Sequence, residues 1–369
     1  MRLKRGLMLA LCSTISLSLS LSLSLSLNSA ELPSLPEAVS NNAVAKVSTK
    51  QGDHLLSFMG LAEGLTYTHV HNKVWALKLE SDEGEQALKQ WQAKSPVPSS
   101  LPLKGRLASI AVGIGDRAYI FGGYTVDKEH QERSSPDNFI YHLESDSYQK
   151  IASTPVAVDD AMALAYQNRY IYLISGWHND GNVNLVQVYD TNNDNWQQAS
   201  PFLGVPVFGH SGGLVDDKIL LCDGVKVQAR EGKRRTFVAE PACYLGKINS
   251  ADPAKIDWRV IKHPTGIARY RMAAVGVASS KQFLFYGGSD NPYNYNGIGY
   301  NAQPAEPSPQ LWLFDLPSLS WQTRQLAQGS MDHRGMLLIG SKEQLTGVVI
   351  GGMGPQQRVL SDVKLISLQ

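Results

Sequence analysis

The stretch Ala118-Tyr-Ile-Phe-Gly-Gly123 decides the fold, because it recurs along the whole chain. Its copies are Ile171-Tyr-Leu-Ile-Ser-Gly176, Ile219-Leu-Leu-Cys-Asp-Gly224, Phe283-Leu-Phe-Tyr-Gly-Gly288, Val348-Val-Ile-Gly-Gly352 and a degenerate first copy, Leu55-Leu-Ser-Phe-Met-Gly60. Glycines at the end of a hydrophobic run relieve side-chain crowding where a strand ends. Self-similarity with a fixed spacing is the sequence signature of a repeat architecture.

Each copy is followed by the same series of features. A variable loop leads into a strand that carries an aromatic residue; these strands are expected at 74–80, 138–143, 186–190, 242–248 and 311–315. A Trp or a substitute comes next, at Trp91, Tyr148, Trp196, Trp258 and Trp321. Short apolar runs bounded by turn residues predict four strands in each copy.

The repeat resembles that of the Kelch family of β-propellers, and the resemblance covers nearly all of residues 31–369. It implies an all-β chain with six four-stranded blades, near the period of about 50 residues quoted for Kelch units. The last copy supplies strands only at 335–339, 347–351 and 362–368, so residues 31–38 are expected to complete it and close the ring. The chain length alone would predict two domains; the repeat predicts one.

Residues 1–30 have the pattern of a secretory signal peptide. A basic start containing Arg2, Lys4 and Arg5 precedes an uncharged run that ends near Ala30, and this predicts a periplasmic or secreted protein. An uncleaved membrane anchor is the alternative, and no other stretch is apolar for long enough to span a bilayer. The remaining residues carry 31 basic and 33 acidic side chains, which excludes nucleic-acid binding through a general basic field.

Only two cysteines follow the predicted signal peptide, Cys222 and Cys243. In an oxidising compartment this pair favours a disulfide, which two arms of one hairpin would bring together. Two buried free thiols remain the alternative. No metal or other cofactor is predicted, because His69-Val-His71 has no evident third ligand and 190–201 lacks the Gly and closing Glu of a calcium loop.

The first strands of the blades start at one rim of a propeller's central channel, so their first residues converge there. These starts lie near Asn42, Arg106, Asp160, His210, Arg271 and Arg334, with Asp159, Arg269, Asp332 and His333 beside them. Three arginines with a carboxylate and an imidazole would bind an anionic or polyhydroxylated ligand. The alternative is that the arginines brace neighbouring blades.

Loops that follow the second strands are expected on the same rim. The loop 291–300 contains Tyr293 and Tyr295 among Asn and Gly, and Trp177 follows the third glycine. Aromatic rings with adaptable polar neighbours are common in sugar-binding and protein-binding loops. The same residues could equally form a structural cover over the rim. The basic loop 226–235 is expected to be a solvated hairpin tip.

The signal segment, six copies and the Leu32-Pro-Ser-Leu-Pro36 start are also similar to periplasmic Kelch mutarotases of N-acetylneuraminic acid. That resemblance implies binding of a small acidic carbohydrate at the central funnel and interconversion of its anomers. The acid–base candidates are His210, His333, Asp160 and Asp332, and the ligand-binding candidates are Arg106, Arg269, Arg271, Arg334, Tyr293, Tyr295 and Trp177. The family's long insertion in a middle blade is absent, because the third blade has only 177–184 there. A non-catalytic module that binds a protein segment or glycan is the alternative.

Overall fold

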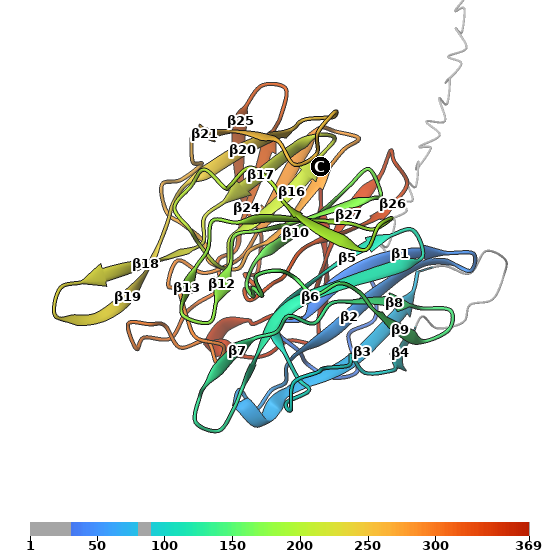
Figure 1. Cartoon of the computed structure of the whole chain (residues 1–369), viewed down its shortest axis with the longest axis horizontal. Helices are drawn as coiled ribbons and strands as arrows, with labels where there is room; N and C mark the ends of the chain where they lie inside the picture. Colours follow the sequence, from blue (N-terminus) through green and yellow to red (C-terminus); the bar gives the residue numbers. More distant parts are fainter. Residues whose placement is uncertain (1–30, 80–89, 369) are drawn as a thin grey trace, which may run out of the picture. The chain divides into compact units, whose positions relative to one another are not determined.

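The computed structural model describes residues 31–79 and 90–368, and residues 32–369 form one compact unit. The predicted signal peptide lies outside the described residues. Six antiparallel sheets follow one another along the chain and are arranged as the blades of a propeller (Figure 1). Six copies of the glycine motif therefore correspond to six blades, which confirms the predicted fold class. No helix in the described part of the chain is long and apolar enough to span a membrane.

Within a blade the strands follow one another from the centre outward. The innermost strands are β1 (Ala43–Thr49), β5 (Leu107–Ile114), β10 (Met162–Tyr166), β16 (Ser211–Val215), β22 (Ala273–Val277) and β26 (Leu337–Gly340). The second strands are β2 (Gly52–Leu61), β6 (Arg117–Val126), β11 (Tyr170–Ile174), β17 (Lys218–Cys222), β23 (Gln282–Tyr286) and β27 (Leu345–Ile350).

The outer half of each blade carries the predicted aromatics. The third strands are β3 (Val70–Lys78), β8 (Phe139–His142), β14 (Val186–Asp190), β20 (Cys243–Ile248), β24 (Gln310–Asp315) and β28 (Val363–Ser367). The fourth strands are β4 (Trp91–Lys94), β9 (Ser147–Lys150), β15 (Asn195–Gln198), β21 (Ile256–Ile261) and β25 (Ser320–Gln325), and each contains its expected Trp or Tyr.

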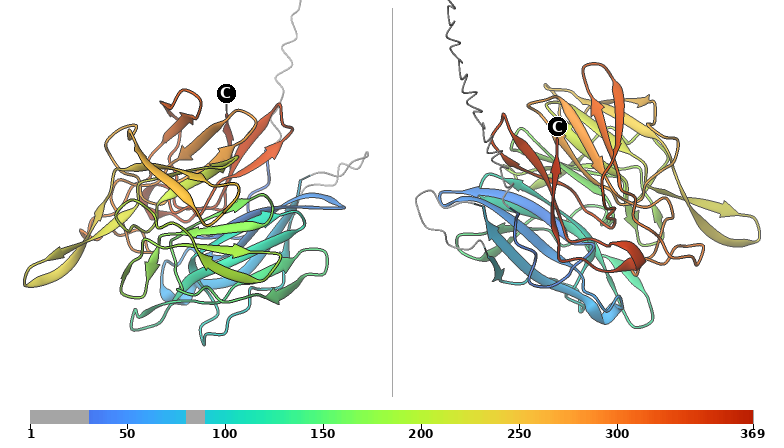
Figure 2. Two further views of the ribbon diagram at one scale, coloured as in Figure 1. Left: turned by 45° about the horizontal axis from the view of Figure 1, so that its top comes forward. Right: turned by 180° about the vertical axis from the view of Figure 1, so that it is seen from behind.

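Additional short elements lie on the loops that follow the second strands. They are β7 (Glu132–Ser134), β12 (Trp177–His178), β13 (Gly181–Asn182), β18 (Val225–Arg230), β19 (Lys233–Ala239) and the 3-10 turns η1 (Tyr67–His69) and η2 (Pro355–Gln357). The basic loop is the β18–β19 hairpin, which projects from the body of the propeller (Figures 1 and 2).

The last blade differs in detail from the prediction. Its sheet has three strands, β26-β27-β28, and no strand is assigned within residues 32–39. Pro33 and Pro36 lack the N–H groups that a ladder needs, so this segment cannot pair along its length. It still joins the first and last blades, because the N–H of Leu35 donates to the Ser361 carbonyl (2.8 Å) and that of Val39 to the Leu360 carbonyl (3.0 Å).

The glycine pairs have a clear structural role. Gly122 and Gly287 adopt φ values of 55° and 78°, in the left-handed region that favours glycine. A Cβ on Gly122 would lie 2.1 Å from the Val158 carbonyl oxygen, and one on Gly287 would lie 2.0 Å from that of Ser330. Both carbonyls belong to the segment that leads into the next blade. The motif therefore marks where one blade's backbone abuts its neighbour.

Candidate functional site

The six blades are tied together at one rim by a ring of hydrogen bonds. At the start of each blade one residue adopts a positive φ of 51–67°; these residues are Asn41, Ala108, Asp160, Gly209, Arg271 and Asp332. The ring consists of Asn41 N to Asp332 O (3.1 Å), Asp160 N to Ala108 O (3.1 Å), Gly209 N to Asp160 O (2.8 Å), Arg271 N to Gly209 O (2.9 Å), His333 N to Arg271 O (3.2 Å), and Ala108 N to the Asn41 side-chain oxygen.

This backbone ring brings together side chains that are far apart in sequence. We call Asn41, Asp160, Arg271, Asp332 and Arg334 the hub. The Arg271 Nε donates to both oxygens of Asp160 (3.2 and 3.1 Å), and one terminal nitrogen donates to Asp332 Oδ1 (2.8 Å). Arg334 pairs with Asp160, and the Asn41 amide donates to Asp332 Oδ1 (2.9 Å). All five side chains are buried.

The charges of the hub compensate one another. Two arginines face two aspartates, so the buried cluster has no net charge if all four are ionised. Although burial opposes ionisation of Asp160, Arg271 and Arg334 outweigh it and lower its pKa. Breaking one pair would leave a buried charge without its partner, which typically costs about 3–5 kcal/mol. The hub is therefore a structural connection between the third, fifth and sixth blades as well as a cluster of reactive groups.

A layer of aromatic side chains covers the hub on the loop side. We call Tyr124, Trp177, Phe208, Tyr270, Tyr293 and Tyr295 the rim layer; all six belong to one buried apolar cluster. The Arg271 guanidinium lies over the rings of Tyr270 and Tyr293, at 4.6 and 5.5 Å from their centroids. The Tyr270 hydroxyl donates to Asp160 Oδ2 (3.0 Å). Cation–π contacts and this hydrogen bond fix the layer on the hub.

The comparisons with known proteins agree with this architecture. No protein-family model matches the chain. Kelch domain-containing protein 3 of Homo sapiens is 23% identical over 211 residues, which are 53% of this chain and 52% of that protein. The chain therefore matches about half the length of this curated relative. A solved structure described as "Structure of YjhT" has a TM-score of 0.69 and 15% identity, and covers 92% of this chain and 97% of its own.

The chain is a six-bladed propeller. It is similar to a Kelch domain-containing protein over about half its length, and the structural likeness at 15% identity shows the fold alone. In this propeller the predicted ring of blade starts is close to the observed one. The observed positions are Asn41 rather than Asn42, Ala108 rather than Arg106, Gly209 rather than His210, and Asp332 rather than Arg334.

Two predicted histidines lie beside the hub. His210 and His333 line a void of about 10 Å³ together with Arg334 and Ser211, which is about the space that one water molecule needs. Burial lowers the pKa of His210 to about 4 and that of His333 to about 3, so both are neutral near pH 7. His333 Nε2 is 2.8 Å from the Ser330 hydroxyl. The catalytic roles expected for the two histidines, Asp160 and Asp332 remain predictions.

The remaining predicted ligand residues do not all reach the hub. Arg106 lies within the second blade, where its guanidinium donates to the carbonyls of Gly122 (2.9 Å) and Asp137 (3.2 Å). Arg269 pairs with Asp290 (3.3 Å). The guanidinium contacts of both arginines therefore lie within their own blades, and their role in ligand binding remains a prediction.

The aromatic candidates all take part in the rim layer. Tyr293 packs edge-on against Tyr270, with ring centroids 5.0 Å apart. Tyr295 Oη is 3.4 Å from His130 Nδ1. Trp177 packs against Phe208, with Arg235 over its ring at 5.0 Å. The two cysteines lie elsewhere, opposite each other on β17 and β20, where they form a disulfide.

Two residues near the hub were not predicted. Glu132 on β7 is opposite Val126 of β6, and Tyr124 is on β6 itself. Glu132 is exposed to solvent. Neighbouring protein atoms nevertheless desolvate its carboxyl group and raise its pKa, while Arg271 opposes this shift and Asp160 adds to it. Burial raises the pKa of the Tyr124 hydroxyl, and Glu132 adds to this effect. A carboxyl group with a raised pKa is suited to proton transfer near neutral pH.

Several buried polar atoms at this rim have no hydrogen-bond partner among the described residues. They include the Tyr293 hydroxyl, Asp332 Oδ2, and Nε and one terminal nitrogen of Arg334, the last lying 3.6 Å from Asp332 Oδ1. A buried polar atom without a partner costs about 1–3 kcal/mol, so such atoms usually bind a ligand or an ordered water. Donors and an acceptor without partners therefore occur both in the hub and in the rim layer.

Proposed function

We propose that this propeller binds a small acidic carbohydrate, of the sialic acid class, over the hub, and that it interconverts the anomers of that sugar. The observation that carries the proposal is the group of buried polar atoms without partners, next to tyrosine rings. Hydroxyl groups of a sugar would donate to Asp332 Oδ2 and accept from Tyr293 and Arg334. The flat rings of the rim layer would pack against the sugar's apolar face.

The chemistry of anomer interconversion needs one proton acceptor and one proton donor. A base removes the proton of the anomeric hydroxyl, and an acid protonates the ring oxygen as the ring opens. Glu132 is the candidate for both roles in turn, because its carboxyl group is desolvated near the hub and its pKa is raised. Asp160 is less suited, since Arg271, Arg334 and Tyr270 occupy its oxygens and its pKa is lowered.

The acidic group of the sugar would be held by the arginines at the hub. Arg271 and Arg334 already balance two aspartates, so a carboxylate would share their remaining N–H groups instead of meeting free cations. A neutral sugar would lose this interaction but keep the hydroxyl contacts. Comparing N-acetylneuraminic acid with a neutral hexose therefore separates the contribution of charge from that of the hydroxyl groups.

We also propose that the protein acts outside the cytoplasm. The disulfide between Cys222 and Cys243 supports this, because disulfides persist mainly in oxidising compartments. The signal peptide expected at residues 1–30 would provide the route. Detection of the protein in a periplasmic or culture-medium fraction, with both thiols resistant to alkylation, would support export. Recovery in the cytoplasm with two reactive thiols would contradict it.

A proton NMR time course tests the catalytic proposal. Freshly dissolved α-anomer of N-acetylneuraminic acid is followed with and without the purified protein, and a protein-dependent rise in the rate of approach to equilibrium is expected. Glu132→Gln should lower that rise by about 10²-fold or more, as loss of a general acid–base group does. Glu129→Gln is the matched control, because Glu129 is exposed and has only the nearby Lys128 as a partner.

The outcomes separate the proposed functions. An unchanged rate with broadened sugar signals would indicate a binding protein without catalysis. No change in either the rate or the line width would remove the sugar proposal. The alternative is then a module that binds a protein segment, for which the exposed β18–β19 hairpin beside Trp177 is the first surface to vary.

A further inference from the structure

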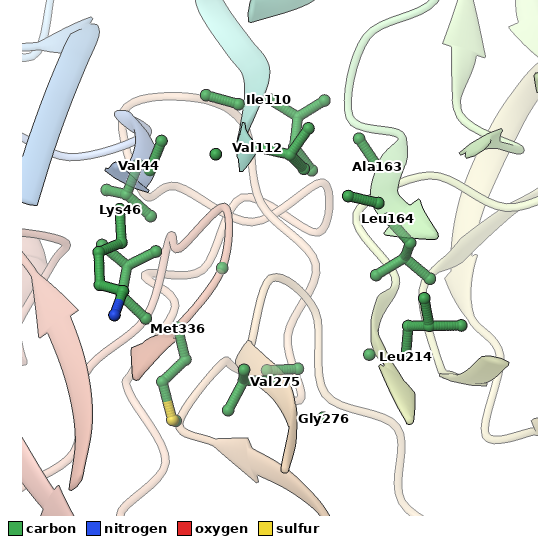
Figure 3. Close-up of a pocket in the computed structure, with 18 of the residues that line it drawn as sticks. Val44, Lys46, Ile110, Val112, Ala163, Leu164, Leu214, Val275, Gly276 and Met336 are labelled. Carbon is green, nitrogen blue, oxygen red and sulfur yellow. The ribbon is translucent and has the colours of Figure 1, made fainter. Parts of the chain in front are cut away.

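The axis of the propeller contains a cavity on the far side of the hub. It has a volume of about 360 Å³ and is lined by the innermost strands of all six blades. Figure 3 shows lining residues from the different blades arranged around it; the apolar ones labelled include Val44, Ile110, Val112, Leu164, Leu214, Val275 and Met336. Its volume is within the roughly 300–1,000 Å³ of small-molecule pockets.

The cavity is closed at one end and accessible from the other. Arg334 lies at the hub end, where it pairs with Asp160 of the hub. Farther along the innermost strands, Val112, Leu214, Val275 and Leu337 are partly exposed although they face inward. Solvent therefore reaches apolar side chains inside the lumen. Contiguous apolar surface in contact with water marks a binding site in many soluble proteins.

Several of the residues that line the lumen are small. Ala111, Ala163, Ala165, Gly213 and Gly276 all line it. The lining includes two cationic side chains, Lys46 and Arg334, and no acidic one. Lys46 lies on β1 beyond Val44, away from the hub, and is partly exposed, with its ammonium 2.9 Å from Asp53. A partly exposed pair of this kind is weak, so Lys46 can also bind another anion.

We propose that this cavity binds an aliphatic monocarboxylate, with its hydrocarbon chain in the lumen and its carboxylate at Lys46. The chain replaces water against the apolar walls, and the charge stays near solvent at the open end. At about 30 Å³ for each carbon, the volume of one water molecule, the lumen holds about ten carbons. This site is on the other side of the hub from the proposed sugar site and does not depend on it.

Isothermal titration calorimetry with hexanoate, octanoate and decanoate tests the proposal on the purified protein. Affinity should increase about fourfold with each added methylene, as expected for burial of hydrocarbon. Lys46→Met should weaken octanoate binding about two- to fivefold and leave 1-octanol binding unchanged. Equal affinities along the series, or no saturable heat with decanoate, would overturn the site. Unchanged octanoate binding by Lys46→Met would overturn the position of the carboxylate.

Filling the lumen provides the matched test of location. Val275→Trp should abolish decanoate binding, because the indole occupies the space of the chain. Val260→Trp is the control, since Val260 is on the outer strand β21 and is 65% exposed. Leu214→Phe, on a different blade, serves if Val275→Trp does not fold. Normal decanoate binding by a folded lumen variant would show that the carboxylate binds elsewhere and overturn the proposal.

Discussion

Two buried tyrosines at the rim differ in the hydrogen bonding of their hydroxyl groups. Tyr270 and Tyr293 pack against each other and against Arg271, and both are fully buried. The Tyr270 hydroxyl donates to Asp160 Oδ2 at 3.0 Å, whereas the Tyr293 hydroxyl has no hydrogen-bond partner among the described residues. Replacing each by Phe keeps the ring and removes the hydroxyl. The two substitutions therefore compare a paired with an unpaired buried group.

The expected effects on stability have different sizes. Tyr270→Phe removes a hydrogen bond to a charged group, so the free energy of unfolding should fall by about 1.5–3 kcal/mol. Tyr293→Phe removes a hydroxyl that makes no hydrogen bond in the free protein. The free energy of unfolding should therefore stay within about 0.5 kcal/mol of the original value or rise. Tyr172→Phe is a useful reference, because the Tyr172 hydroxyl donates to the neutral Pro253 carbonyl (2.7 Å) and its loss should cost about 1 kcal/mol.

Guanidinium chloride unfolding at pH 7, with the disulfide intact, measures these differences. If Tyr293→Phe lowered the midpoint as much as Tyr270→Phe, the Tyr293 hydroxyl would already be satisfied in the free protein, and the argument for a ligand at that position would fail. The same variants connect stability to function. Tyr293→Phe should weaken sugar binding at unchanged stability, which distinguishes a ligand contact from a fold contact.

Three further predictions concern the ring and the fourth blade. Gly122→Ala should lower the free energy of unfolding by about 2–4 kcal/mol, because the left-handed φ and the nearby Val158 carbonyl both oppose a Cβ. Gly181→Ala is the control and should have little effect, because the space around Gly181 is open. Urea unfolding of the two variants measures the difference. Replacing Cys222 and Cys243 by Ala should cost about 3 kcal/mol for a loop of 21 residues, and equal midpoints before and after the change would contradict this. The folded-state pKa of His210 is lowered to about 4, so its contribution to stability is complete above its ordinary value of 6.5 and is lost as the pH falls from there through 4. His210→Gln should therefore reduce the slope of stability against pH over this range by about one proton, and an unchanged slope would show that His210 is protonated in the folded protein.

The blades could be predicted from the sequence because their signal is local. Each hydrophobic run with its terminal glycines indicates one strand and one contact with the next blade. The contact between Gly122 and Val158 is an example. The prediction of a strand in the N-terminal segment is wrong. The missing fourth strand of the last blade indicated it, but Pro33 and Pro36 have no N–H groups for strand pairing. Closure itself needs only the two hydrogen bonds from Leu35 and Val39.

The hub could be located from the sequence but its pairing could not. The blade starts were placed within about two residues, yet Arg271 and Asp160 are 111 positions apart and no local pattern indicates that they pair. No single residue type occupies all the ring positions. Their common property is a positive φ, which the sequence does not show directly. Glu132 follows a variable loop and has no distinctive neighbours in sequence. Its raised pKa comes mainly from desolvation by the surrounding protein, with Arg271 lowering the pKa and Asp160 raising it.

The division between closure and ligand binding follows from these contacts. Holding five non-glycine residues with positive φ costs about 1–3 kcal/mol each, and the surrounding ring must compensate for it. Residues that make the ring and the ion pairs are therefore constrained by folding, whatever the ligand. Glu132 and the hydroxyl of Tyr293 lie outside these constraints, since neither closes the ring nor balances a hub charge. Substitutions at these two positions should change what the propeller binds before they change whether it folds.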